Sequence, residues 1–147
     1  MFAWHRSPGA LKALIPPWER VEVEKAPASL GDGETAVLVM RMGPLKLRWV
    51  ARHRDYIDRG PEGGEFTDEQ VSGPFASWVH RHIVRATGPG RCVLEDRIEY
   101  ALPLGWVGER AAGWHVRRKL RKMFEFRHRA TRDAVLAELA AGEKRGG

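Results

Sequence analysis

The sequence has little cysteine and no long apolar run. Cys92 is the only cysteine among the 147 residues, so the chain can form neither a disulfide framework nor a thiolate zinc site. No stretch approaches the roughly 18 apolar residues of a membrane-spanning helix, and the first residues lack the pattern of a signal peptide. The expected location is therefore a reducing cytoplasm, where Cys92 packs as a small apolar residue inside a strand.

Internal repeats and low-complexity segments are also absent, and the length suits one domain. We assign residues 1–141 to that domain and residues 142–147 to a frayed tail. The net charge of +6 attracts anions in general. Charge alone does not choose among nucleic acid, an acidic membrane and an acidic protein.

The order of secondary structure predicts an α+β domain. Two short helical turns are expected within residues 2–15, and six strands then follow at 20–25, 34–42, 45–57, 66–71, 77–84 and 91–102. A long helix is expected at 109–140, with an apolar stripe of Val116, Leu120, Met123, Phe124, Thr131, Ala134, Val135 and Leu139. A run of strands before one long helix indicates an antiparallel sheet that packs on that helix.

Alternation along the strands brings polar side chains to the inner face. Trp78, His80, His82 and Val84 share a face of one strand, and Phe66, Asp68 and Gln70 share a face of the strand before it. On the last strand, alternation places six side chains on one face: Cys92, Leu94, Asp96, Ile98, Tyr100 and Leu102. On the strand at 45–57, the residues that share one face are Leu45, Leu47, Trp49, Ala51 and His53. Histidines and aspartates are thus expected to meet inside a mostly apolar interior.

Five segments carry a family resemblance: DEQ at 68–70, GPF at 73–75, WVHRH at 78–82, DRIEYALPLG at 96–105 and FEFRHR at 124–129. With them the chain resembles the small bacterial SRPBCC proteins, of the superfamily that includes START lipid-transfer domains, polyketide cyclases and the birch-pollen-allergen fold. The resemblance covers residues 2 to about 139. It implies a helix-grip fold, in which a curved antiparallel sheet wraps around a long C-terminal helix.

In that family a first β-strand precedes the two short helices, whereas this sequence begins at the helix. The expected fold is therefore a helix-grip fold with its first strand missing, either because the start codon is misassigned or because the protein is a variant. A sheet edge left open in this way would favour pairing with a second copy, so a homodimer is a possible assembly.

The resemblance implies a cavity between sheet and helix that encloses a lipid, polyketide or quinone-like molecule, and no cofactor. The expected function is that of a carrier or binding protein, and core packing is the alternative role for the same side chains. The expected ligand-binding residues are Trp49, His53, Trp78, His80, His82, Leu94, Asp96, Ile98, Tyr100, Val116, Leu120 and Phe124.

His80 and His82 are two residues apart on a strand, so both face the same way. This spacing could serve a metal ion with Asp96 or His53, but hydrogen bonding to inward carboxylates is the preferred interpretation, and no metal is assigned. The alternative function is a cyclase or dehydratase in which His80 is the base and Asp68 or Asp96 orients it. No serine or cysteine nucleophile accompanies these residues in a recognisable motif.

The basic run at 115–132 is the strongest electrostatic feature. A solvated helix face is its simplest interpretation. An anionic membrane, contacted through Arg117, Arg118, Arg121 and Lys122, is the preferred functional one, and an acidic protein partner is a third possible function. Nucleic acid has less support because no helix-turn-helix or aromatic-basic strand motif accompanies the charge.

Overall fold

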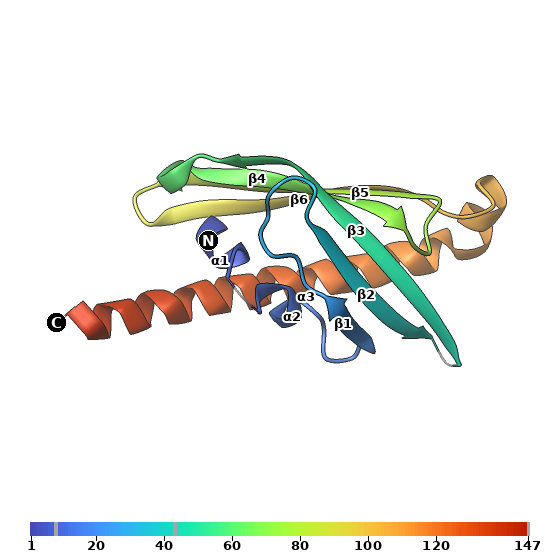
Figure 1. Ribbon diagram of the computed structural model, residues 1–147, viewed down its shortest axis with the longest axis horizontal. Coiled ribbons are helices and arrows are strands. Elements are labelled where there is room, and N and C mark those ends of the chain that lie inside the picture. The colour runs from blue at the N-terminus through green and yellow to red at the C-terminus, as the bar shows by residue number, and fades with distance from the viewer. Residues whose placement is uncertain (8, 43, 147) are drawn as a thin grey trace.

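The computed structural model describes residues 1–7, 9–42 and 44–146, and it shows a curved antiparallel sheet beside one long helix (Figure 1). The strands are β1 Val21–Lys25, β2 Thr35–Met42, β3 Leu45–Asp58, β4 Gly63–Ser72, β5 Ser77–Gly88 and β6 Arg91–Ala101. They lie in the sheet in chain order, and each neighbouring pair is antiparallel. The predicted α+β, helix-grip arrangement is confirmed.

The helices are α1 Phe2–His5, α2 Ala10–Ala13, the short 3-10 helix η1 Gly60–Glu62, and α3 Trp106–Gly146. The two short N-terminal helices lie where the sequence predicts them. The long helix exceeds its predicted bounds of 109–140 at both ends and includes most of the segment assigned to a frayed tail. Residue 147 lies outside the described residues.

The sheet bends within β3, which is 14 residues long. Its pairing with β4 shifts register between Arg54 and Ile57, and Asp55 within that shift has a φ of 57°. A bulge of this kind bends a strand and increases its twist. In Figure 1, β1, β2 and the start of β3 slope away from β4, β5 and β6 on the side where α3 lies. The bend therefore produces the concave face on which the interior is built.

The concave face carries the predicted alternation. Trp78, His80, His82 and Val84 on β5 are all buried, whereas Arg81 and Arg85 on the opposite face are exposed. On β6 the inward Leu94, Ile98 and Tyr100 are half-buried. The expectation for Cys92 is wrong, because this residue lies near the start of the edge strand β6 and its side chain is exposed.

The stripe on α3 packs as predicted over its middle part. Phe124 and Thr131 are buried, and Val116 and Leu120 are half-buried. Leu139 is 61 % exposed, contrary to the prediction, since the C-terminal end of α3 extends past the sheet (Figure 1). Neither α3 nor any other helix in the described ranges has the length and hydropathy to cross a membrane.

The N-terminal segment, described over residues 1–7 and 9–15, packs between the sheet and α3 through two apolar clusters. In the first, Phe2 packs with Leu30, Phe66 and Val84 over the concave face. In the second, Trp4, Ala10 and Leu14 pack with Ala134 and Val135 of α3. The segment is thus held from both sides, and it covers the concave face at the point where the sheet bends.

Gly63 on β4 provides a test of the close contact between β4 and β5. Its φ is 116°, and a Cβ there would lie 2.0 Å from the carbonyl oxygen of Val84 on β5. We expect Gly63→Ala to lower the free energy of unfolding by about 3 kcal/mol, because backbone strain and a backbone clash add. Urea denaturation followed by circular dichroism measures the change.

Gly60→Ala is the matched control, since Gly60 has a φ of 57° and open space around the missing Cβ. It should cost only the backbone strain, about 1 kcal/mol. An equal decrease in the free energy of unfolding in the two variants would mean that β4 and β5 move apart to accommodate the added methyl group.

Candidate functional site

Five of the six histidines gather around two aspartates on the concave face. These are His5, His53, His80, His82 and His128, and the aspartates are Asp68 and Asp96. The sixth, His115, is exposed on α3. Only the strand residues of this group were expected to meet, and His5 and His128 join them from α1 and α3.

Strand register assembles the centre of the cluster. Asp68 on β4 is paired with His53 on β3 and with His80 on β5, so these three form one row across the sheet. In the next row, His82 on β5 is paired with Phe66 on β4 and with Asp96 on β6. Paired residues on one face lie about 5 Å apart, which is within reach of an imidazole and a carboxylate.

Asp68 accepts hydrogen bonds from two histidines. Nε2 of His53 lies 3.0 Å from its Oδ1, and Nε2 of His82 lies 3.0 Å from its Oδ2. Nδ1 of His80 is 3.9 Å from Oδ2, too far for a hydrogen bond. The Asp68–His80 pair considered from the sequence is therefore not hydrogen-bonded.

Asp96 holds three histidines and does pair with His80. Nε2 of His80 and Nδ1 of His82 lie 2.9 and 3.0 Å from its Oδ1, and Nε2 of His128 lies 2.6 Å from its Oδ2. A carboxylate can only accept, so each facing ring nitrogen carries a proton. His82 donates through both nitrogens, to Asp68 and to Asp96, and is therefore an imidazolium ion.

The surroundings of His82 support this charge. Burial disfavours the charged ring, but hydrogen bonds to Asp68 and Asp96 and the charges of both carboxylates raise its pKa to about 9. Phe66 stacks on the ring with centroids 4.2 Å apart and an interplanar angle of 9°. An aromatic face favours a cation over it, so the stacking adds to the effect of the carboxylates.

The pKa values of the neighbouring titratable groups are shifted as well. Burial and then the charge of His82 lower the pKa values of His5 and His80 to about 4, so both are neutral near pH 7. Burial disfavours the charged forms of Asp68 and Asp96, yet hydrogen bonds from the surrounding histidines hold their pKa values well below the usual range. Beside the two carboxylates, His82 is thus a buried imidazolium ion, and His5 and His80 are neutral imidazoles.

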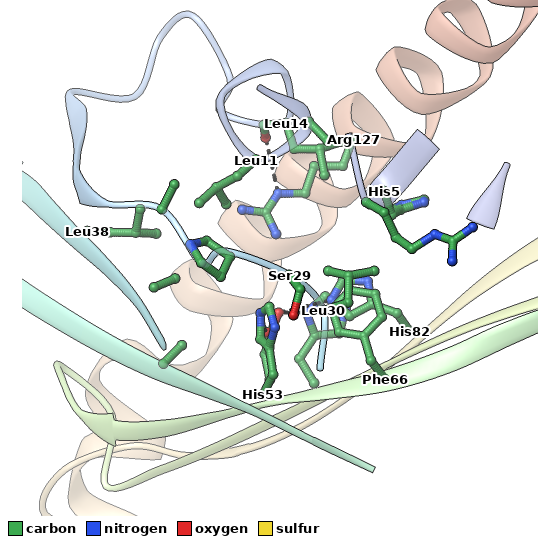
Figure 2. A pocket seen from close by; sticks show the side chains of 18 of the residues that line it. His5, Leu11, Leu14, Ser29, Leu30, Leu38, His53, Phe66, His82 and Arg127 are labelled. Atoms are coloured by element: carbon green, nitrogen blue, oxygen red, sulfur yellow. Dashed lines mark hydrogen bonds and ion pairs between the residues drawn. The ribbon is translucent and has the colours of Figure 1, made fainter. Parts of the chain in front are cut away.

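Arg127 reaches the same region from α3. Its Nε donates to the carbonyl oxygen of Leu14 at 3.2 Å, and its guanidinium group extends from the helix toward the concave face (Figure 2). Burial lowers its pKa, and the charges of Asp68 and Asp96 oppose that effect. Within the described part of the chain, no carboxylate lies within ion-pair distance of the guanidinium group.

A cavity of about 310 Å³ lies between the concave face and the N-terminal segment. Its apolar wall includes Ala10, Leu11, Leu14, Ala26, Pro27, Leu30, Ala36, Leu38, Trp49, Ala51, Phe66, Trp78 and Met123, and its polar wall includes His5, Ser7, Ser29, His53, Asp68, His80, His82 and Arg127. Met123 and Arg127 are the residues that α3 contributes to the lining. The N-terminal segment and residues 26–30, rather than α3, form most of the wall opposite the sheet.

The structure places part of the expected ligand-binding set at this cavity. Trp49, His53, Trp78, His80 and His82 line it, and so does the catalytic candidate Asp68. The remaining expected residues, Leu94, Asp96, Ile98, Tyr100, Val116, Leu120 and Phe124, are not part of its lining. They lie on β6 or on α3, where helix and sheet pack together: the ring of Phe124 meets His80 edge-on at 5.0 Å.

Sequence reasoning missed several lining residues. His5 lies in α1, Leu14 directly follows α2, and Leu30 lies in the loop between β1 and β2. In these short or irregular segments no periodicity assigns a side chain to the interior. Arg127 was counted with the basic run, although it lies three residues after Phe124 and four before Thr131, both buried on the stripe. That spacing was a usable signal for an inward-facing arginine.

The four basic residues considered for docking are exposed on α3. Arg117 forms an ion pair with Glu109, Nζ of Lys122 lies 4.4 Å from the ring centroid of Trp18, and the guanidinium group of Arg118 lies 5.8 Å from that of Trp114. These contacts are compatible with a solvated helix face. Because all four side chains are exposed, their positive charges can also contact an anionic surface.

Comparison of the chain with protein-family models, with curated proteins and with solved structures found no match. The resemblance described above therefore stays an expectation, and the function has to be inferred from the site.

The histidine cluster predicts a stability maximum near pH 6.5. The pKa of about 9 at His82 lies above its ordinary value of 6.5, so the folded protein binds more protons than the unfolded chain between these values, and stability falls as pH rises through them. His5 and His80, with pKa values of about 4, act in the opposite sense, and stability falls as pH drops from 6.5 to 4. Each proton changes the free energy by about 1.4 kcal/mol per pH unit.

Urea denaturation in EDTA-containing buffers between pH 4 and pH 9 measures this profile. His5→Gln should make the acid side shallower and leave the alkaline side unchanged. His115→Gln, on the surface of α3, is the matched control and should change neither. A stability that rises steadily from pH 6.5 to 9 would contradict the assignment of His82 as a cation.

Proposed function

We propose that this protein binds a compact hydrophobic small molecule with an anionic group, as a binding or carrier protein. The observation that carries the proposal is the guanidinium group of Arg127, which faces a largely apolar cavity and has no carboxylate partner among the described residues. The lipid, polyketide or quinone classes implied by the resemblance all include compact molecules of this kind.

The cavity supports the size and apolar character of the ligand. A volume of about 310 Å³ is at the lower end of the range for small-molecule sites. It suits a ring system or a short acyl chain better than a lipid with two long chains. Burial of apolar surface against Leu14, Leu30 and Leu38 would stabilise the complex by about 25 cal/mol per Å².

Electrostatics support the anionic group. Asp68 is hydrogen-bonded to His53 and His82, and no ion pair joins it to Arg127 in the described part of the chain. Arg127 is half-buried, and a carboxylate or phosphate can pair with its guanidinium group through two parallel hydrogen bonds. Nδ1 of His53 and Nε1 of Trp49 are buried without partners in the described ranges, and both residues belong to the cavity wall.

Catalysis by His80 has weaker support. The residue lines the cavity and pairs with Asp96, as a cyclase or dehydratase would require. However, burial holds its pKa at about 4, and a general base works best when its pKa lies near the working pH. We therefore rank binding before turnover.

Naphthoate and naphthylmethanol form a matched pair of probes, since they share an apolar body and differ in charge. We expect naphthoate to bind at least about tenfold more tightly, and Arg127→Gln to remove that preference, because the charge-assisted hydrogen bonds are lost. Isothermal titration calorimetry in EDTA measures both affinities. Arg129→Gln, at an exposed position of α3, is the control and should bind both probes as the wild type does.

Ala51→Phe tests the cavity itself, since Ala51 lines it from β3 and a phenyl ring would occupy the space. It should abolish binding of both probes while leaving the protein folded. If the wild type binds neither probe, and native mass spectrometry of the protein from its host also detects no bound organic molecule, the proposal fails. If Arg127→Gln weakened the binding of naphthoate and naphthylmethanol equally, Arg127 would have a structural role and would not recognise the anionic group.

A docking surface for an anionic membrane is the second part of the proposed function. Leu104 just before α3, and Trp106 and Trp114 within it, are 82, 78 and 69 % exposed. Arg118 and Arg121 follow on the same helix. Exposed indole rings beside cationic side chains are typical of surfaces that bind at the membrane interface. A carrier needs such a surface to exchange a hydrophobic ligand.

We expect Arg118→Glu combined with Arg121→Glu to weaken binding to vesicles that contain phosphatidylserine by about tenfold or more, since each charge near an anionic surface contributes about 1 kcal/mol. Vesicle flotation measures the change. Lys46→Glu with Arg91→Glu alters the net charge equally at exposed positions outside α3 and is the control. Equal losses in both double variants would indicate attraction by net charge rather than a docking face.

A further inference from the structure

Three ligand atoms converge in the wall of the cavity. Oδ2 of Asp68 lies 3.0 Å from Nε2 of His82 and 3.9 Å from Nδ1 of His80. The three residues can each offer one such atom within 4.8 Å of the others. Two donors that bind one zinc ion tetrahedrally at about 2.0 Å are separated by about 3.3 Å, so these spacings bracket those of a metal centre.

The remaining polar atom of each of these residues is already held by another side chain. Oδ1 of Asp96 accepts from Nε2 of His80 and from Nδ1 of His82, which leaves the opposite nitrogen of each ring on the side of Asp68. Nε2 of His53 donates to Oδ1 of Asp68 and leaves Oδ2 on the side of the histidines. Metal-binding histidines usually donate their second nitrogen to a carboxylate in this way, and metal-binding carboxylates are themselves hydrogen-bonded.

From this arrangement we propose that Asp68, His80 and His82 form a binding site for one divalent transition-metal ion. The ion would take the place of the proton that His82 now shares with Asp68, and the displaced proton would leave to solvent. The inference goes beyond the proposed small-molecule function and does not depend on it. It also differs from the expectation drawn from the sequence, which assigned no metal.

The donor set narrows the class of ion. Two imidazole nitrogens and one carboxylate oxygen suit Zn²⁺, Fe²⁺ or Co²⁺, whereas Mg²⁺ and Ca²⁺ prefer oxygen donors. All three residues line the cavity, so a fourth position would face it, and an anionic or neutral oxygen of a bound molecule could occupy that position. Figure 2 shows His82 and His53 at the sheet side of this cavity, with Arg127 entering from α3.

Cobalt binding is the decisive experiment. Purified protein is treated with EDTA, desalted and titrated with CoCl₂ while visible absorption is recorded, and Zn²⁺ affinity is measured by calorimetry. We expect one equivalent of Co²⁺ to produce the intense d–d bands of a four- or five-coordinate ion, and Zn²⁺ to displace it. His80→Gln should weaken Zn²⁺ binding by about 100-fold or more, and His53→Gln, which only orients Asp68, by about tenfold.

His115→Gln removes a surface histidine of α3 and should bind both ions as the wild type does. A wild-type affinity no greater than that of His80→Gln, or a Co²⁺ spectrum that stays that of the hydrated ion, would overturn the proposal. X-ray absorption of the wild-type zinc complex decides the question even if a variant fails to fold. Two imidazole nitrogens with oxygen support the site, whereas a sulfur donor from Cys92 or oxygen donors alone refute it.

The outcome is separable from that of the proposed function, since naphthoate binding is measured in EDTA. Loss of one activity with retention of the other identifies which proposal has failed. A metal on Nδ1 of His80 would also exclude a role for that nitrogen in proton transfer.

Discussion

The interior depends on one constraint, which is that the negative charges of two inward-facing carboxylates must be compensated. Asp68 and Asp96 project from β4 and β6 into a space enclosed by sheet, short helices and α3, where an unpaired charge would be costly. Histidines from β3, β5 and α3 supply the donors, and His82 supplies a full positive charge between the two. The same hydrogen bonds therefore neutralise the carboxylates and tie α3 to the sheet.

The cavity takes its polar wall from this network and its apolar wall from the N-terminal segment. The two proposed occupants use different atoms of that wall. An anionic group would bind the guanidinium group of Arg127, and a metal ion would bind Asp68, His80 and His82. The two proposed sites share no donor atom, so neither proposal depends on the other.

Much of this arrangement follows from local pattern in the sequence. Alternation on β5 and β6 placed His80, His82 and Asp96 on the inner face, and strand pairing then brought Asp68 and His53 beside them. The choice of partners did not follow: Nε2 of His80 lies 2.9 Å from Asp96, whereas its Nδ1 lies 3.9 Å from Asp68. The lining from residues 26–30 and from α1 has no periodic signal, and the charge of Arg127 concealed its inward position.

Chain order adds a consequence for how the molecule matures during synthesis. Each strand pairs with its neighbour in sequence, so the sheet can assemble from local hairpins as the chain emerges, whereas the last donor to Asp96 is His128 on α3. The nascent sheet thus carries a carboxylate whose compensation is incomplete until α3 has been made. The guanidinium group of Arg127 belongs to the same helix, so the cavity gains this positive charge in the same step that completes the hydrogen bonds of Asp96.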